Sequence, residues 1–257
     1  MPIAQTSAVA SSFSGISETS SPQVLLIGSG KGGVGKSTFS AMLSKGLSEH
    51  LRVLLLDFDL CGPSIGILMG DKGEKVFKGS KGLVPLEHSP TLHYLSIASL
   101  IPTGSAVIWR APKKIGLLGM FADSIDSTKY DWVVIDLPPG ITDEHVFAVE
   151  RFPRAKALIV TTSQNLSLEE ASGTISFLQK KQIGVVGVIE NMSTFECPSC
   201  AECTPIFSKG GGKLLADASA VSYLGSIPVL PDTTIIPPAL AALVSLLAGN
   251  GANPNTQ

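Results

Sequence analysis

A glycine-rich segment between an apolar run and an amphipathic stretch constrains this chain more than any other feature. The apolar run Val24–Gly28 is predicted to be a strand, and Lys36–Leu51 carries apolar residues at helical spacing. Between them lies a segment that fits the pattern G-x-x-x-x-G-K-[ST], made of Gly30, Lys31, Gly32, Gly33, Val34, Gly35, Lys36, Ser37 and Thr38. A strand, a glycine-rich turn and a helix in this order predict a loop that wraps its backbone around an anion.

Each part of this loop has a chemical reason. Glycines let successive backbone N–H groups turn toward one anion without a Cβ in the way, and the helix N-terminus adds its positive end. The pattern predicts that Lys36 contacts the β- and γ-phosphates of ATP and that the Ser37 hydroxyl ligates Mg²⁺. The segment therefore indicates a nucleotide-binding ATPase.

Two more predicted strands end in acidic residues. Val53–Asp57 is apolar up to its last residue, and the apolar run after Trp132 ends at Asp136. Carboxylates at the carboxyl ends of parallel strands face the ligand crevice of an open α/β sheet. We expect Asp136 to orient Mg²⁺ through water and Asp57 to contact the magnesium shell.

Predicted strands and helices alternate along most of the 257 residues, and no internal repeat interrupts them. Hydrophobic residues make up 44% of the chain and charged residues 16%, which suits strands buried on both faces. This pattern predicts an α/β fold: a doubly wound, mostly parallel sheet with helices on both faces. We expect one domain over 23–248, between a disordered Ser-rich tail (1–22) and a second disordered tail (249–257).

Charge and hydropathy exclude several partners. The net charge of −2 gives no footprint for nucleic acid, and no apolar run approaches the roughly 18 residues of a membrane span. Export and mitochondrial signals require basic residues, and the first 22 residues contain no Lys or Arg. We therefore expect a cytoplasmic protein. The short runs Lys113-Lys114 and Lys180-Lys181 are expected on solvated helix faces.

Three of the four cysteines are crowded at Cys197, Cys200 and Cys203. A C-P-x-C pair can hold one metal ion or one edge of a cluster, and a complete site wants about four ligands. A two-fold dimer would supply them, two from each chain. Spacing alone leaves iron–sulfur, zinc, a redox pair and metal-free thiols open, and the role of Cys203 is open as well.

Lys31 departs from an ordinary phosphate loop. It lies on the wrong side of the turn to reach its own γ-phosphate, but it could reach across a two-fold axis into a partner's site. The pattern K-G-G-x-G-K-[ST] resembles the deviant Walker A class of P-loop ATPases, which includes MinD, ArsA and the nitrogenase iron protein. The resemblance implies a nucleotide-sandwich dimer in which Lys31 acts in trans, Asp59 positions the attacking water and Asn191 reads the adenine edge.

Further segments resemble the Mrp-type ATPases. Asp136–His145 is similar to their D-T-P-P-G-T-S-D-E-H, with Leu137 and Ile141 in place of two threonines. Glu190–Ser193 and Cys197–Thr204 look like those of cytosolic iron–sulfur scaffold ATPases. Ala106–Lys114 also looks like their A-V-I-W-R-G-P-K, with Ala111 in place of glycine. The resemblance covers about residues 24–238.

This resemblance implies a weak ATP hydrolase that assembles a labile [4Fe–4S] cluster on Cys197 and Cys200 of two chains and transfers it to cytosolic or nuclear apoproteins. Residues 1–60 contain no cysteine. The chain therefore looks like the shorter type, which forms a homodimer or pairs with a longer scaffold ATPase that carries an N-terminal four-cysteine motif.

Two other classes remain as alternatives. A MinD-type positioning ATPase wants a basic amphipathic tail, and no Lys or Arg follows Lys213. A zinc-bridged targeting chaperone wants a large apolar helical groove, and the five methionines are scattered.

Overall fold

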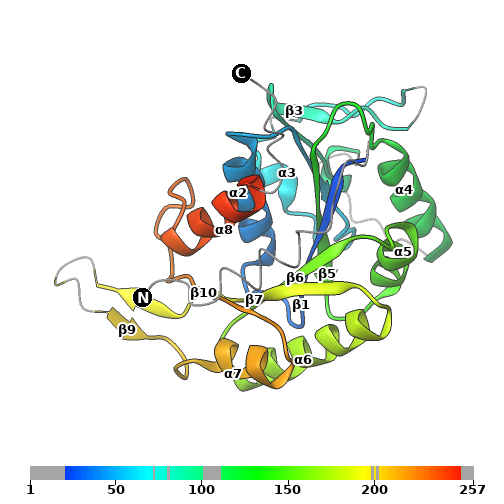
Figure 1. Cartoon of the computed structure of the whole chain (residues 1–257). Coiled ribbons are helices and arrows are strands. Elements are labelled where there is room, and N and C mark those ends of the chain that lie inside the picture. The colour runs from blue at the N-terminus through cyan, green and yellow to red at the C-terminus, as the bar shows by residue number, and fades with distance from the viewer. Residues whose placement is uncertain are drawn as a thin grey trace.

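The structure of the chain is a computed structural model, which describes residues 21–71, 73–79, 82–100, 111–197, 200 and 203–249. The strands of its main sheet are β1 (Gln23–Ser29), β2 (Val53–Asp57), β3 (Leu86–Ser89), β4 (Leu92–Leu95), β5 (Trp132–Pro139), β6 (Lys156–Thr161), β7 (Gly184–Glu190) and β10 (Tyr223–Ser226). Their order is β10-β7-β6-β1-β5-β2-β4-β3 (Figure 1). Only β3 runs antiparallel, against β4.

Helices connect these strands. They are α2 (Lys36–Ser48), α3 (Ile65–Leu68), the 3₁₀ turn η1 (Ile97–Ser99), α4 (Ala111–Asp123), α5 (Asp143–Arg151), α6 (Asn165–Lys180), α7 (Gly211–Ala218) and α8 (Pro238–Gly249). A parallel sheet needs such crossover connections, which place helices on its faces. The predicted α/β fold class is confirmed. None of the described helices is long and apolar enough to cross a membrane.

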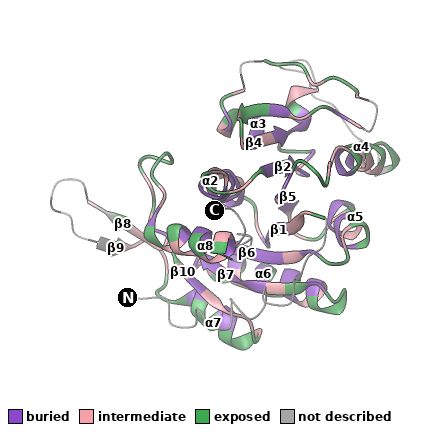
Figure 2. Cartoon of the chain, turned by 45° about the horizontal axis from the view of Figure 1, so that its top comes forward, coloured by how far each residue is buried: buried purple, intermediate pink, exposed green. Residues whose placement is uncertain are grey.

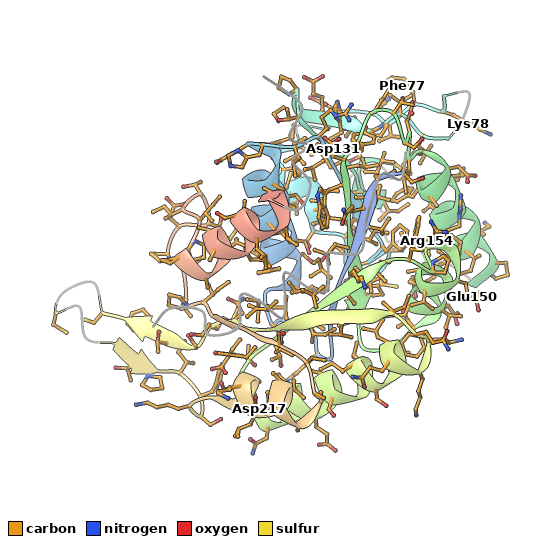
Figure 3. All side chains as sticks on the ribbon, viewed as in Figure 1. Phe77, Lys78, Asp131, Glu150, Arg154 and Asp217 are labelled. Atoms are coloured by element: carbon orange, nitrogen blue, oxygen red, sulfur yellow. The ribbon has the colours of Figure 1, made fainter. Side chains whose placement is uncertain are left out.

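Two hydrophobic cores lie on opposite faces of the main sheet (Figure 2). Successive strand residues point to opposite faces, so Leu25 and Ile27 belong to one core while Leu26 belongs to the other. The first core includes α2, α3 and α8, and the second includes α4, α5, α6 and α7. Charged side chains such as Glu150 and Asp217 project outward from the helices (Figure 3). The apolar strands are therefore covered on both sides.

A separate two-stranded ribbon carries the cysteine motif. Its antiparallel strands are β8 (Thr194–Glu196) and β9 (Cys203–Pro205), with Phe195 opposite Thr204. Figure 1 shows this ribbon projecting from the body of the molecule beside β10. The sequence predicts no regular structure for this segment, and the ribbon appears only in the structure.

Other details differ from the sequence predictions. Helix α5 was not predicted, because its apolar residues are few. The spacing of Ser167 and Glu170 predicts a capping box and a helix over 167–181. The helix α6 begins earlier, at Asn165, because Ser167 is buried and its hydroxyl accepts a hydrogen bond from Thr162 Oγ1 at 3.2 Å. The prediction that Lys113 and Lys114 are both solvated is wrong for Lys114, which pairs with a buried carboxylate.

The predicted tails fall almost entirely outside the described residues: of 1–22 only the last two are described, and of 249–257 only Gly249, which ends α8. Most of the A-V-I-W-R-type stretch also lies outside them.

Replacing either of two glycines with alanine is expected to change the free energy of unfolding, with opposite signs at the two positions. A Cβ at Gly187 of β7 would collide with the carbonyl of Ser222, whereas one at the exposed Gly173 of α6 meets nothing within 4 Å. We expect Gly187→Ala to lower the free energy of unfolding by about 1–3 kcal/mol through overpacking. Gly173→Ala should raise it by about 0.5–1 kcal/mol, because alanine favours the helix. Urea denaturation measures both, and equal signs would contradict the packing of β7 against β10.

Candidate functional site

The glycine-rich loop lies between β1 and α2, as predicted. Gly33 and Gly35 have φ angles of 81° and 82°, a left-handed conformation that favours glycine. No side chain caps α2, whose first residue is Lys36. Its N-terminal N–H groups are therefore available to an anion, which is the property that the pattern predicted. A cavity of about 240 Å³, which we call the phosphate cavity, opens here, lined by the loop, Asp59 and Pro139.

Asp136 is the centre of the hydrogen bonds beneath this loop. Its Oδ2 lies 2.8 Å from Lys36 Nζ and accepts a hydrogen bond from Ser37 Oγ at 2.6 Å. Its Oδ1 accepts one from Ser40 Oγ, also at 2.6 Å. The carboxylate is fully buried, so these donors offset the cost of its desolvation.

Sequence reasoning missed Ser40. The available signal was its spacing, since residues four apart lie on the same face of a helix and Ser40 follows Lys36 by four. The oxygen atoms of Ser37 and Asp136 are ligands of the type that Mg²⁺ prefers, and they lie side by side next to the phosphate cavity. These residues fit a magnesium ion that accompanies a bound nucleotide.

The two acids at the end of β2 differ in environment. Asp57 is buried, and its oxygens accept hydrogen bonds from Ser96 Oγ at 2.8 Å and from the N–H groups of Ile65 and Asp59. Burial, with Asp136 adjacent on β5, raises the pKa of Asp57 to about 8. Asp59 lines the phosphate cavity and accepts a hydrogen bond from the Gly62 N–H at 3.0 Å. Of the two, Asp59 is the one that borders the phosphate cavity.

Asn191 and Lys31 lie at different sides of the loop. Asn191 Nδ2 donates to the Val34 carbonyl at 2.9 Å, and the side chain borders an apolar cavity lined by Phe39, Met42 and Ile227, among others. The predicted nucleotide-binding asparagine therefore touches the loop itself. Lys31 Nζ lies 3.4 Å from Gln164 Oε1 of the same chain, at the start of α6.

The segment after β5 is held against the phosphate loop. The Gly140 N–H donates to the Ser29 carbonyl at 3.0 Å, and Gly140 has a φ of 76°. Helix α5 follows at once, and His145 Nδ1 accepts a hydrogen bond from the Thr142 N–H at 3.3 Å. His145 is fully buried, its Nε2 has no partner among the described residues, and burial lowers its pKa to about 4. His145 thus lies in the first turn of α5 and does not line the phosphate cavity.

The ribbon presents two cysteines at its connecting turn. Cys197 follows β8 and is half-buried, and Cys200 is exposed. Cys203 begins β9, and its side chain is outside the described part of the chain. Among the described residues, no three His, Cys, Asp or Glu side chains are grouped to hold a metal ion.

The base of the ribbon is joined to the wall of the apolar cavity. The Val229 N–H donates to the Thr194 carbonyl at 2.8 Å, and the Ser193 N–H donates to the Ile227 carbonyl at 3.0 Å. Ile227 and Val229 both line that cavity, as does Asn191 just after β7. The backbone from Ile227 to Val229 therefore contacts both the apolar cavity and the ribbon that carries the cysteines.

The fold and the loop define the class of protein. A nucleotide-binding protein from Archaeoglobus fulgidus, solved in complex with ADP, has a TM-score of 0.70 and 28% identity, with 94% of this chain and 92% of that chain covered. The septum site-determining protein MinD from Pyrococcus horikoshii, complexed with Mg-ADP, has a TM-score of 0.62 at 22% identity, covering 90% and 99%. The chain is a P-loop NTPase with the fold of MinD.

Sequence comparison narrows the class. The profile described as "ParA: NUBPL iron-transfer P-loop NTPase" matches residues 20–237, and the chain belongs to this family. The cytosolic Fe-S cluster assembly factor Nubp2 homolog of Aedes aegypti is 43% identical over 235 residues, 89% of this chain and 86% of that protein. The NUBP2 homolog of Dictyostelium discoideum is 43% identical over 218 residues, 82% of each chain. The resemblance inferred from the motifs is confirmed.

Ser40 and Ser44 provide a matched test of the Asp136 contact. Both hydroxyls are buried on α2, but Ser44 Oγ has no partner among the described residues. We expect Ser40→Ala to raise the Mg²⁺ concentration needed for nucleotide binding about tenfold, because a residue that orients a metal ligand is lost. Ser44→Ala should leave this requirement unchanged. Titration of Mg²⁺ against a fluorescent ATP analogue measures both, and identical curves would contradict the role of Ser40.

His145 predicts a pH dependence of stability. Its pKa is lowered from 6.5 in the unfolded chain to about 4, so the unfolded chain binds a proton that the folded chain does not as the pH falls from about 6.5 to 4. The stabilisation is fully present above pH 6.5, and up to about 3 kcal/mol is lost by pH 4.

Urea denaturation at several pH values measures this loss. In His145→Asn, which keeps an acceptor near Thr142 but does not titrate, that part of the slope should disappear. Burial also lowers the pKa of His93, but His93 is present in both proteins and cancels in the difference. Equal slopes in the two proteins would refute the assignment.

Proposed function

We propose that this chain is an ATP-hydrolysing scaffold of the cytosol, which assembles a labile [4Fe–4S] cluster between two chains and passes it to cytosolic or nuclear apoproteins. The observation that carries the proposal is the ribbon that holds Cys197 and Cys200 at its turn and is joined by hydrogen bonds to the wall of the apolar cavity. The names of the relatives, cytosolic Fe-S cluster assembly factors, support the cargo and the compartment.

The nucleotide site supplies the first half of the function. ATP would place its phosphates at the N-terminus of α2 against Lys36, with Mg²⁺ held by Ser37 and, through water, by Asp136. The base would occupy the apolar cavity beside Asn191, and Asp59 would orient the water that attacks the γ-phosphate. We assign hydrolysis to this site and expect it to be slow.

Dimerisation supplies the second half. Two thiolates from one chain make half of a four-cysteine site, so Cys197 and Cys200 of two chains would complete it. The second chain is another copy or a longer scaffold ATPase with an N-terminal four-cysteine motif. In such a dimer Lys31 would leave Gln164 and place its charge on the partner's γ-phosphate.

Hydrolysis and cluster release are then linked through short backbone segments. Binding of adenine would move or fix Ile227 and Val229 in the wall of the apolar cavity. The backbones of these two residues are hydrogen-bonded to Ser193 and Thr194, where the ribbon begins. Closure of the dimer around ATP thereby changes the spacing of the four shared thiolates.

Anaerobic reconstitution with iron and sulfide tests the proposal. The wild type should gain a charge-transfer band and about four iron ions per dimer. Cys197→Ser and Cys200→Ser should each lose both, because two of the four ligands disappear from the dimer. Cys61→Ser is the matched control, since Cys61 is exposed but lies near α4, away from the ribbon, and it should bind iron as the wild type does.

Two results would contradict the proposal. A wild type that keeps zinc and takes up no iron would point to a zinc-bridged targeting ATPase. A Lys36→Ala variant that binds no ATP yet transfers its cluster to an apoprotein as fast as the wild type would refute the dependence on ATP.

A further inference from the structure

Lys114 of α4 is a lysine whose position the nucleotide-binding function does not explain. Its Nζ lies 2.9 Å from Glu144 Oε1 and 3.3 Å from Cys61 Sγ, so one ammonium group on α4 contacts two other segments of the chain. Glu144 is only 2% exposed. Burial pushes the pKa of Glu144 up, but hydrogen bonds from Thr142 and Lys114 hold it below its ordinary value. The carboxylate is therefore charged and depends on Lys114 for compensation.

The contact with Cys61 places Lys114 on the loop after β2. Cys61 lies between Asp59 and Gly62, which are themselves joined by a hydrogen bond from the Gly62 N–H to Asp59 Oδ1. Both Asp59 and Gly62 line the phosphate cavity. A movement of this loop on nucleotide binding would therefore change the contact between Cys61 Sγ and the Lys114 ammonium.

The contact with Glu144 places Lys114 on the segment after β5. Glu144 lies in the first turn of α5, beside Thr142 and His145, which hold the start of that helix. Two residues before Thr142, the Gly140 N–H is bonded to the Ser29 carbonyl at the base of the phosphate loop. The start of α5 is thus connected to the phosphate loop through the hydrogen bond between Gly140 and Ser29.

An aromatic cluster joins the same three segments. Phe58, which lies between Asp57 and Asp59, is fully buried. Its ring centroid lies 6.5 Å from that of Phe121 on α4 and 6.1 Å from that of Phe147 on α5. The loop after β2 is therefore attached to α4 and α5 by an apolar contact and by the Lys114 contacts.

We propose that Lys114 is a positioning residue that couples the loop after β2 to the segment after β5, so that the two respond to bound nucleotide together. The inference rests on the proposed nucleotide binding, but not on cluster assembly. A buried ion pair adds little net stability compared with apolar residues of similar size, so a role in holding geometry accounts better for this arrangement. Lys114 does not line the phosphate cavity, and it acts through the Glu144 carboxylate and the Cys61 thiol.

The experiment uses Cys61 as a native reporter in the full-length chain. Alkylation of Cys61 is followed by peptide mass spectrometry, with and without a non-hydrolysable ATP analogue, in the wild type, Lys114→Met, Glu144→Gln and Lys113→Met. Lys113 is the matched control, because it is adjacent, exposed and also positive. Steady-state ATP hydrolysis and the melting temperature are measured for each protein.

In the wild type and in Lys113→Met, the analogue should change the alkylation rate of Cys61 at least threefold. This response should be lost in Lys114→Met and also in Glu144→Gln, although Glu144 is paired with Lys114 and not with Cys61. Turnover should fall about tenfold in both variants with the KM for ATP within twofold. A variant that combines Lys114→Met with Glu144→Gln should turn over ATP no more slowly than Lys114→Met alone, because both changes break the same contact between Lys114 and Glu144.

A nucleotide response of Cys61 that persists in folded Glu144→Gln and Lys114→Met would overturn the inference. A uniform fall in melting temperature with unchanged turnover would overturn it as well, because that is what a purely structural pair predicts. A wild type that binds the analogue without any response at Cys61 overturns the inference and leaves the proposed function in place. A responsive wild type that takes up no cluster overturns the proposed function only.

Discussion

The hydrogen bonds from α2 to the Asp136 carboxylate are the interaction on which the nucleotide site depends. Asp136 belongs to a central strand, and its oxygens accept from Lys36, Ser37 and Ser40 of the helix that follows the phosphate loop. A buried carboxylate without these donors would be strongly disfavoured. The contacts therefore set the position of α2 against β5, and with it the conformation of the glycine-rich loop between β1 and α2.

The parallel sheet makes that contact possible. β5 lies between β1 and β2, with Asp136 opposite Ile27 on one side and Asp57 on the other. Every strand of this group ends at the same edge, so the loops that follow them converge on one cavity. The helices on both faces bury the apolar strands and hold the register that brings these carboxyl ends together. The polar site thus rests on two apolar cores.

Two connections lead away from the phosphate cavity in different directions. One passes through the backbone around Ile227 and Val229 to the cysteine ribbon. The other passes through Phe58 and Lys114 to α4 and α5. Both connect segments that follow different strands, and both use contacts of a few ångströms between otherwise independent loops. A small displacement at the phosphates can therefore reach distant parts of the molecule, because packed interfaces do not deform continuously.

The sequence by itself determined the features that depend on neighbouring residues. The phosphate loop, the apolar strands and the acid at the end of β5 follow from spacing and hydropathy, and together they specify the fold class and the place of Lys36, Ser37 and Asp136. Tertiary structure decided the rest. Ser40 reaches Asp136 across a separation of 96 residues, and Lys114 meets Cys61 and Glu144 across separations of 53 and 30 residues. Spacing places Ser40 on the helix face of Lys36, but the pairings themselves depend on the packing of whole helices against the sheet.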